Sequence, residues 1–219
     1  MNQKDLYVVF DMDGVLFDSE RLIQRYWLAV GARHHLPDIG ETFLQCVGTT
    51  RAHSRAVFER RYPDFSYTQF QDECRALFFG AIEDTGMPLK PGAEDILSHL
   101  RAQNAAIGLA SSTRMELVKC ELESVGLLQY FDVLITGDQL ERSKPAPDIY
   151  LMACEALGAD PKQAWAIEDS YNGIRSAAAA GMRALMVPDL LPETEEMEQL
   201  AEAIVPDLAA AERYILRYR

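Results

Sequence analysis

The stretch YVVFDMDGVLFDSE, residues 7–20, places two acidic residues, Asp11 and Asp13, directly after a short apolar run. Residues 7–10 are apolar and β-prone without a break, which is typical of a strand that is covered on both faces. Two carboxylates one residue apart repel each other unless a positive group lies near them. The stretch therefore predicts a buried parallel strand that ends in a site needing positive charge.

The composition limits the class of protein and its partners. The chain has 219 residues, a hydrophobic content of 48% and a formal net charge of −13. No apolar run approaches the roughly 18 residues that span a bilayer, and the first residues lack a signal-peptide pattern. The negative charge argues against nucleic acid or an anionic membrane as partner. Four scattered cysteines lack metal or disulfide spacing. We expect a cytoplasmic globule with enough core for a stable monomer.

Strand and helix patterns alternate along most of the chain. This alternation predicts an α/β fold, a doubly wound parallel sheet with right-handed crossovers. Gly126, Gly158 and Gly181 follow three of the helical patterns and suit left-handed helix ends. The expected strands are residues 7–10, 105–110, 132–136, 164–167 and 183–187, and the expected helices between them are 93–103, 114–125, 147–157 and 171–180.

The first crossover is much longer than the others. About seventy residues separate residue 17 from the PLKPG turn at 88–92, far more than an ordinary connection requires. Helical patterns cover 19–33, 51–62 and 67–83. We therefore expect a small α-helical domain, residues 18–88, inserted into a Rossmann-like core of residues 1–17 and 89–219.

Polar side chains follow several of the expected strands. Each alone would be a helix cap or a surface charge, but parallel sheets bind ligands at the carboxyl ends of their strands. Because all of these polar side chains would lie along one edge of the sheet, together they predict a functional site. The residues are Asp11 and Asp13, then Ser111 and Ser112, then Glu168 and Asp169, with Lys144 before a helix whose start is marked by Pro145 and Pro147.

The chemistry of these groups suits a metal ion and a phosphate. Carboxylates are hard oxygen ligands, and the absence of sulfur and imidazole favours Mg²⁺ over zinc. A magnesium ion would relieve the repulsion between the acids and bind phosphate oxygens. Lys144, the Ser111 hydroxyl and nearby backbone N–H groups would hold the remaining phosphoryl oxygens.

Four motifs resemble those of the haloacid dehalogenase-like hydrolases. They are DMDGV at 11–15, LASST at 109–113, SKPAPD at 143–148 and AIEDSYNGI at 166–174. Within that superfamily, DGVLFDSE, the helical insert and KPAPDIY resemble the β-phosphoglucomutase and sugar-phosphate phosphatase branch. The resemblance covers nearly the whole chain and implies a Mg²⁺-dependent enzyme with a cap domain that closes over its substrate.

The resemblance also implies roles for individual residues. Asp11 would attack phosphorus and form an aspartyl phosphate, while Asp13 would protonate the leaving oxygen and later deprotonate water. The metal ligands would be Asp11, the backbone carbonyl of Asp13, and Asp169, with Glu168 adjacent. The residues implied for phosphate and substrate binding are Ser111, Ser112, Lys144 and, in the segment CVGTTRAHS at 46–54, Arg51.

The cap sequence bears on the reaction. No lysine lies between Lys4 and Lys90. The insert therefore has no lysine that could form a Schiff base with an aldehyde substrate, as a phosphonate-cleaving relative would need. Ile23 and a position near Leu77 occupy the places where β-phosphoglucomutases have a histidine and a lysine. These differences favour a phosphatase acting on a small phosphorylated metabolite, a sugar phosphate by resemblance, over a sugar phosphomutase. The substrate itself and the roles of Arg51 and His53 stay open.

Two rivals belong to other classes. A receiver domain also combines acids, a hydroxyl and a lysine, but its acidic pair precedes a nucleophile on a later strand, and it has no seventy-residue insert. A catalytically idle binding protein would release no phosphate from p-nitrophenyl phosphate in the presence of Mg²⁺.

Overall fold

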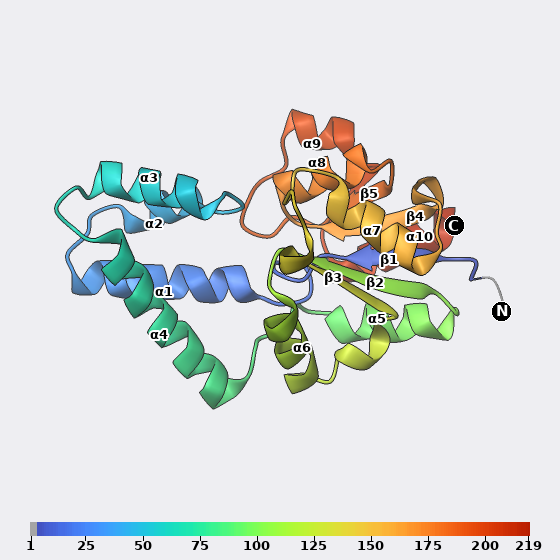
Figure 1. The fold of residues 1–219 in the computed structure, drawn as a ribbon, viewed down its shortest axis with the longest axis horizontal. Coiled ribbons are helices and arrows are strands. Elements are labelled where there is room, and N and C mark those ends of the chain that lie inside the picture. The colour runs from blue at the N-terminus through green and yellow to red at the C-terminus, as the bar shows by residue number, and fades with distance from the viewer. Residues whose placement is uncertain (1–3) are drawn as a thin grey trace. The chain divides into compact units, whose positions relative to one another are not determined.

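A computed structural model describes residues 4–219, and these divide into two compact units (Figure 1). The first unit contains the chain up to Phe17 together with Leu89–Arg219, and the second is Asp18–Pro88. The chain thus leaves the first unit after β1 and re-enters it before α5. Among residues 4–219, no helix is both long enough and apolar enough to cross a bilayer.

The first unit is built on a six-stranded parallel sheet in the order β3-β2-β1-β4-β5-β6. β1 lies in the middle of the sheet, where Tyr7 is in register with Ala106 on one side and Ala164 on the other. The predicted α/β doubly wound fold is confirmed, and β6 is a strand that the sequence did not predict. The bounds are β1 Tyr7–Phe10, β2 Ala106–Ser111, β3 Val133–Thr136, β4 Ala164–Glu168, β5 Arg183–Met186 and β6 Ala203–Ile204.

The four predicted helices of this unit, α5 to α8, are present within two residues of their expected bounds, and α9 and α10 follow β5 and β6 without a predicted range. Gly126, Gly158 and Gly181 have φ values of 73°, 67° and 79°, so they adopt the left-handed conformation expected after helices. The helices are α5 Ala93–Ala102, α6 Met115–Ser124, α7 Asp148–Leu157, α8 Tyr171–Ala179, α9 Glu195–Leu200 and α10 Leu208–Tyr218, with short 3₁₀ turns at Leu128–Tyr130, Gly137–Gln139 and Pro161–Gln163.

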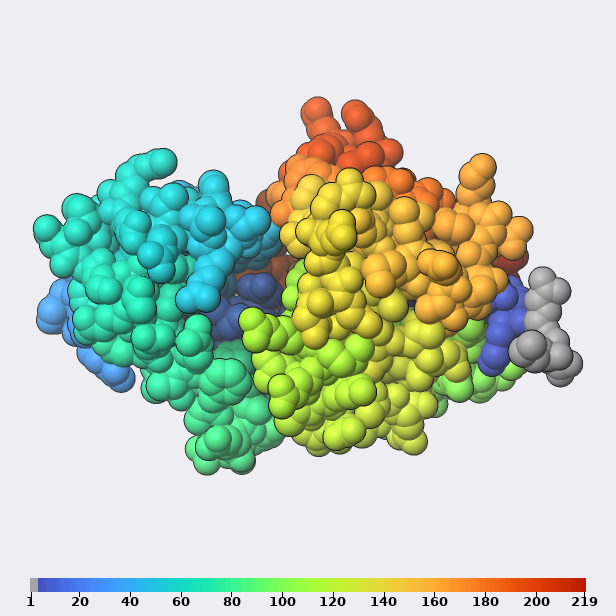
Figure 2. Space-filling model, viewed as in Figure 1, coloured from blue at the N-terminus to red at the C-terminus, as the bar shows by residue number. Residues whose placement is uncertain are grey.

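Apolar side chains from both layers form the core around the sheet. Helices α7, α8 and α9 cover one face, where Ile149, Tyr150 and Ile174 belong to one buried cluster with Val9 and Ala110. Figure 2 shows the segment that carries α7, in yellow to orange, on the outer surface of this unit. This face of the sheet is therefore shielded from water, which fits strands that are apolar on both sides.

The second unit is helical and has its own aromatic core. Its helices are α1 Ser19–Arg33, α2 Ile39–Leu44, α3 Arg51–Arg61 and α4 Tyr67–Thr85. The Trp27 ring meets Phe43, Phe58 and Phe70 edge-on, with centroids 5.3, 6.3 and 4.9 Å apart. Such edge-to-face pairs stabilise beyond the area they bury. These aromatic residues are all buried and form the core of this unit.

Candidate active site

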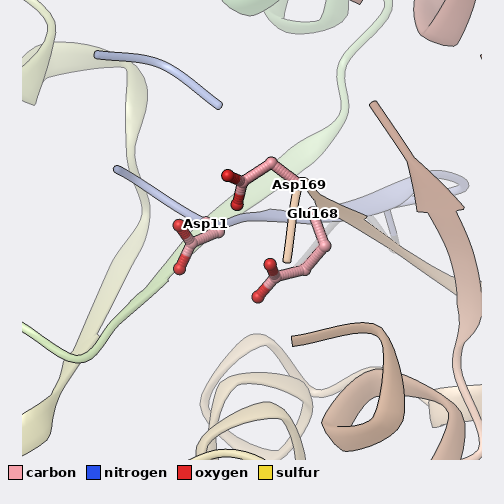
Figure 3. Close-up of side chains that lie close together, drawn as sticks. All are labelled: Asp11, Glu168 and Asp169. Carbon is pink, nitrogen blue, oxygen red and sulfur yellow. The ribbon is translucent and has the colours of Figure 1, made fainter. Parts of the chain in front are cut away.

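The ends of β1 and β4 bring three acidic side chains together (Figure 3). Phe10 is in register with Ile167, and the Asp11 N–H donates to the Ile167 carbonyl at 2.9 Å. Glu168 ends β4 and Asp169 follows it. One carboxylate oxygen from each of Asp11, Glu168 and Asp169 lies within 4.8 Å of the others, and all three residues are buried. The three acids predicted at the carboxyl ends of the strands therefore lie close together.

Lys144 joins two of these acids. Its ammonium donates to Asp11 Oδ1 at 2.5 Å and to Glu168 Oε1 at 2.6 Å. A third hydrogen bond, of 3.0 Å, goes to the backbone carbonyl of Ala110 at the end of β2. Only 8% of the Lys144 side chain is exposed, so this cation is a buried component of the site and not a surface charge.

The cluster carries more negative than positive charge. Burial raises the pKa of Asp11 to about 8, against the opposing effect of Lys144, and Glu168 and Asp13 add to the rise. Burial alone would lower the pKa of Lys144, but the Asp11 and Glu168 carboxylates outweigh it and raise that pKa. One ammonium facing three carboxylates leaves a net negative charge that a divalent cation would neutralise, and the hard carboxylate oxygens of Asp11 and Asp169 suit such an ion.

The end of β2 supplies hydroxyl groups. Ser111 is buried as the last residue of the strand, and its Oγ accepts from the Thr113 N–H at 3.1 Å, which leaves the Ser111 O–H as a donor. Ser112 is exposed. Thr113 Oγ1 donates to Asp13 Oδ2 at 3.3 Å. Thr113 was not predicted as a site residue, although it lies in the LASST segment.

The loop that carries Asp13 approaches Asp169 closely. Gly14 has a φ of 79°, and a Cβ at this position would lie 2.2 Å from Asp169 Oδ2. Only glycine accommodates both this backbone conformation and this approach. The Asp13 carboxylate itself is outside the group of three acids and faces Thr113. Gly14 is thus a structural requirement of the site that the DMDGV motif already contained.

Glu168 has further partners that the sequence did not reveal. The Tyr150 hydroxyl donates to Glu168 Oε1 at 2.7 Å, and the Ser170 hydroxyl donates to Oε2 at 3.1 Å. A Cβ at Gly173 would lie 1.9 Å from Glu168 Cδ, so the carboxylate occupies the space above the first turn of α8. The segment KPAPDIY contains Tyr150, and EDSYNG contains Ser170 and Gly173. The sequence does not indicate that these residues contact Glu168, because the contacts depend on how α7 and the start of α8 pack.

Arg51 belongs to the second unit. It is the first residue of α3, directly after Thr50, whose side chain accepts from the His53 N–H at 3.3 Å and caps the helix. Its side chain is exposed.

Comparison with known proteins identifies the family. The model of the haloacid dehalogenase-like hydrolases matches residues 7–181. The chain is 31% identical over 198 residues to validoxylamine A 7'-phosphate phosphatase of Streptomyces hygroscopicus subsp. limoneus, which covers 90% of each chain. It is 33% identical over 192 residues to hexitol phosphatase B of Escherichia coli K12, which covers 84% of this chain and 83% of the relative.

A solved structure agrees with this assignment. A HAD family hydrolase from Deinococcus radiodurans R1, crystallised with bound phosphate and sodium, superposes with a TM-score of 0.79 at 28% identity and covers 99% of this chain and 97% of its own. Similar solved structures also include a β-phosphoglucomutase-like protein from Thermotoga maritima. The protein therefore belongs to the haloacid dehalogenase-like hydrolases, in the branch that its motifs predict.

Proposed function

We propose that the protein is a Mg²⁺-dependent phosphatase that hydrolyses a small phosphorylated metabolite, a sugar phosphate or a related polyol phosphate, through an aspartyl phosphate. One observation carries the proposal: Asp11, Glu168 and Asp169 converge within 4.8 Å of one another while Lys144 binds the first two. The named activities of the two relatives, on validoxylamine A 7'-phosphate and on hexitol phosphates, support a phosphorylated polyol or sugar as substrate class.

The chemistry divides between Asp11 and Asp13. An Asp11 carboxylate oxygen would attack phosphorus, and the bond from phosphorus to the ester oxygen would break. Asp13 would give a proton to that leaving oxygen and then take a proton from the water that attacks the aspartyl phosphate, which releases inorganic phosphate. The hydrogen bond from Thr113 Oγ1 to Asp13 Oδ2 supports this assignment because it helps to orient the Asp13 carboxylate.

The remaining groups neutralise and position the phosphoryl group. Mg²⁺ would be held by Asp11, the Asp13 backbone carbonyl and Asp169, and when bound it would offset the negative charge of the phosphate. Lys144 and the Ser111 hydroxyl would bind phosphoryl oxygens, with Ser112 at the exposed side. These groups lie at the same edge of the sheet, which supports these roles. Positioning and charge neutralisation account for most of the rate acceleration in phosphoryl transfer.

By family resemblance, the helical unit Asp18–Pro88 would act as a cap that selects the part of the substrate beyond the phosphate, with Arg51 as a contact. Replacing Arg51 with alanine would then change the ranking of substrates more than the hydrolysis of p-nitrophenyl phosphate. We also propose that the enzyme is cytoplasmic, because its four cysteines lack disulfide spacing. We propose that it is a monomer, because its hydrophobic content is enough for a core of its own.

The direct test is a screen of phosphorylated sugars, polyols and nucleosides that measures inorganic phosphate with Mg²⁺ and with EDTA. We expect phosphate release from a subset of these compounds in Mg²⁺ and none in EDTA. Incubation with β-glucose 1-phosphate and a trace of the 1,6-bisphosphate separates the two candidate reactions, because a mutase would form glucose 6-phosphate. Formation of that product without phosphate release would refute the proposal.

A further inference from the structure

The carboxylate of Glu168 has its full complement of hydrogen bonds within the protein. Oε1 accepts from the Lys144 ammonium at 2.6 Å and from the Tyr150 hydroxyl at 2.7 Å. Oε2 accepts from the Ser170 hydroxyl at 3.1 Å and from the Ser170 N–H at 3.4 Å. A carboxylate has about four acceptor sites, and Glu168 is completely buried. While these donors are in place, Glu168 is committed to them.

The ammonium of Lys144 is similarly constrained. It has three N–H donors, and in the structure they go to Glu168 Oε1, the Ala110 carbonyl and Asp11 Oδ1. The first two acceptors are a saturated carboxylate and a backbone carbonyl of β2, so both are fixed. Fixing two N–H groups of an ammonium also fixes the direction of the third. That third N–H points at Asp11, where a phosphoryl group would have to lie for attack.

Tyr150 is well placed to maintain this arrangement. It lies on α7, is completely buried, and packs in the same core cluster as Ala110 and Ile149. The Lys144 ammonium lies 5.2 Å from the centroid of its ring, within the range of a cation–π contact. A buried tyrosine hydroxyl needs a partner inside the protein, and Glu168 provides it. The ring packing thus fixes the position of a hydroxyl that in turn fixes Glu168.

We propose that Tyr150 is a positioning residue whose hydroxyl holds Glu168 Oε1 beside Lys144 and thereby aims the third N–H of Lys144 at the phosphoryl group. The inference rests on the proposed function and deepens it. Without the hydroxyl, Oε1 would have an unused acceptor site and would be held by Lys144 alone. The carboxylate could then turn toward Asp11 and Asp169, whose oxygens are within 4.8 Å, and Lys144 would lose its fixed direction.

The test is Tyr150→Phe, which removes one oxygen and keeps the buried ring. KM for p-nitrophenyl phosphate and the inhibition constant of inorganic phosphate should each rise about tenfold, the effect of losing one hydrogen bond to a charged group. The fall in kcat should be smaller than the rise in KM. Calorimetric titration with Mg²⁺ in the absence of phosphate should show an affinity that is unchanged or tighter, because a freed Glu168 carboxylate can turn toward the other two acids.

A matched control is Tyr62→Phe in the second unit, whose hydroxyl donates to the Pro37 carbonyl at 2.6 Å. It loses a comparable tyrosine hydrogen bond, so it should lower the melting temperature similarly without changing KM. The double variant with Glu168→Gln provides a second readout. If the hydroxyl acts through Glu168, Tyr150→Phe should change KM much less in that background than in the wild type.

Three results would overturn the inference. Tyr150→Phe could leave KM and phosphate inhibition as they are, it could weaken Mg²⁺ binding as much as phosphate binding, or its effect could simply add to that of Glu168→Gln. A wild-type protein that releases no phosphate from any substrate would instead refute the proposed function. The two failures are therefore distinguishable.

Discussion

Asp13 receives a hydrogen bond from a neighbouring hydroxyl. Thr113 Oγ1 donates to Asp13 Oδ2 at 3.3 Å, and Thr113 itself is held by its N–H bond to Ser111 Oγ at 3.1 Å. A general acid must point at the oxygen that it protonates, and its correct placement is worth about 10²- to 10⁴-fold in rate. A residue that only orients the acid should contribute a fraction of that factor.

Thr113→Val should therefore slow the enzyme selectively. For an alkyl phosphate such as a hexitol phosphate, kcat/KM should fall by roughly three- to tenfold, because a mispositioned Asp13 delivers its proton less well. For p-nitrophenyl phosphate the loss should be much smaller, since p-nitrophenolate leaves without a proton. Thr113→Ser keeps the hydroxyl and should restore the alkyl phosphate rate. An equal loss on both substrates would show that Thr113 does not act through Asp13.

Single residues also show how far the site was predictable. Asp11, Ser111, Glu168 and Asp169 could be predicted because the strand ends of a parallel sheet meet at one edge, whatever the details of packing. Lys144 follows no strand directly and was predicted from its place just before a helix. The partners reached through helical register were not predictable in this way. The sequence contains Tyr150 and Gly173, but no pattern in it indicates that they contact Glu168. The packing of α7 and α8 brings them there.

At the scale of elements, the first turn of α8 shows a conflict between helix propensity and the site. Gly173 lies inside the helix, where alanine would be more favourable by about 1 kcal/mol. A Cβ there would lie 1.9 Å from Glu168 Cδ and 2.0 Å from Oε2. Glu168 is held by Lys144, Tyr150 and Ser170, so it cannot move aside without losing hydrogen bonds. The glycine is therefore required by the carboxylate.

Gly173→Ala should reduce phosphatase activity by about tenfold or more and destabilise the protein by about 1–3 kcal/mol, the usual cost of overpacking. The matched control is Gly80→Ala in α4, where a Cβ would have no neighbour within 4 Å. That variant should gain roughly 0.5–1 kcal/mol from helix propensity. Urea denaturation and phosphate release measure both effects. A fully active, stabilised Gly173→Ala protein would contradict this description of Glu168.

The elements that were predictable differ physically from those that were not. The strands β1 to β5 were predicted from apolar runs flanked by turn and cap signals, and each observed end lies within one residue of the expected one. β6 has only two residues, Ala203 and Ile204, both half-buried, so it has no run to detect. α2 begins after Asp38, whose φ of 56° is left-handed, and its six residues are too few for a clear helical period.

At the scale of the whole molecule, the buried acids make stability depend on pH and on divalent cations. The pKa of Asp11 is raised to about 8, chiefly by burial, above its ordinary value near 4. Between these two values the folded protein retains a proton that the unfolded chain has lost. Without a cation, the contribution of Asp11 to stability therefore falls as the pH rises from about 4 to 8.

Mg²⁺ should raise the melting temperature, and the rise should be larger at pH 8 than at pH 6, because the cation competes with the proton for the same oxygens. At 100 times its dissociation constant a ligand stabilises by about 2.7 kcal/mol, which corresponds to roughly 5–10 °C for a chain of this size. Trp165 fluorescence reports on the first unit when Trp27 in the second is replaced by phenylalanine. Asp169→Asn should abolish the shift. An equal shift in that variant would place the cation elsewhere.

The most direct measurement of the central claim is phosphate release by Asp11→Asn with Mg²⁺ and the best substrate from the screen. The nucleophile forms the covalent bond to phosphorus, so its loss should lower kcat by at least about 10⁴-fold, as losing a nucleophile does in other enzymes with covalent intermediates. Asp95→Asn, which neutralises an exposed carboxylate on α5, should retain wild-type activity. If Asp11→Asn releases phosphate nearly as fast as the wild type, Asp11 is not the nucleophile and the mechanism proposed for this site is wrong.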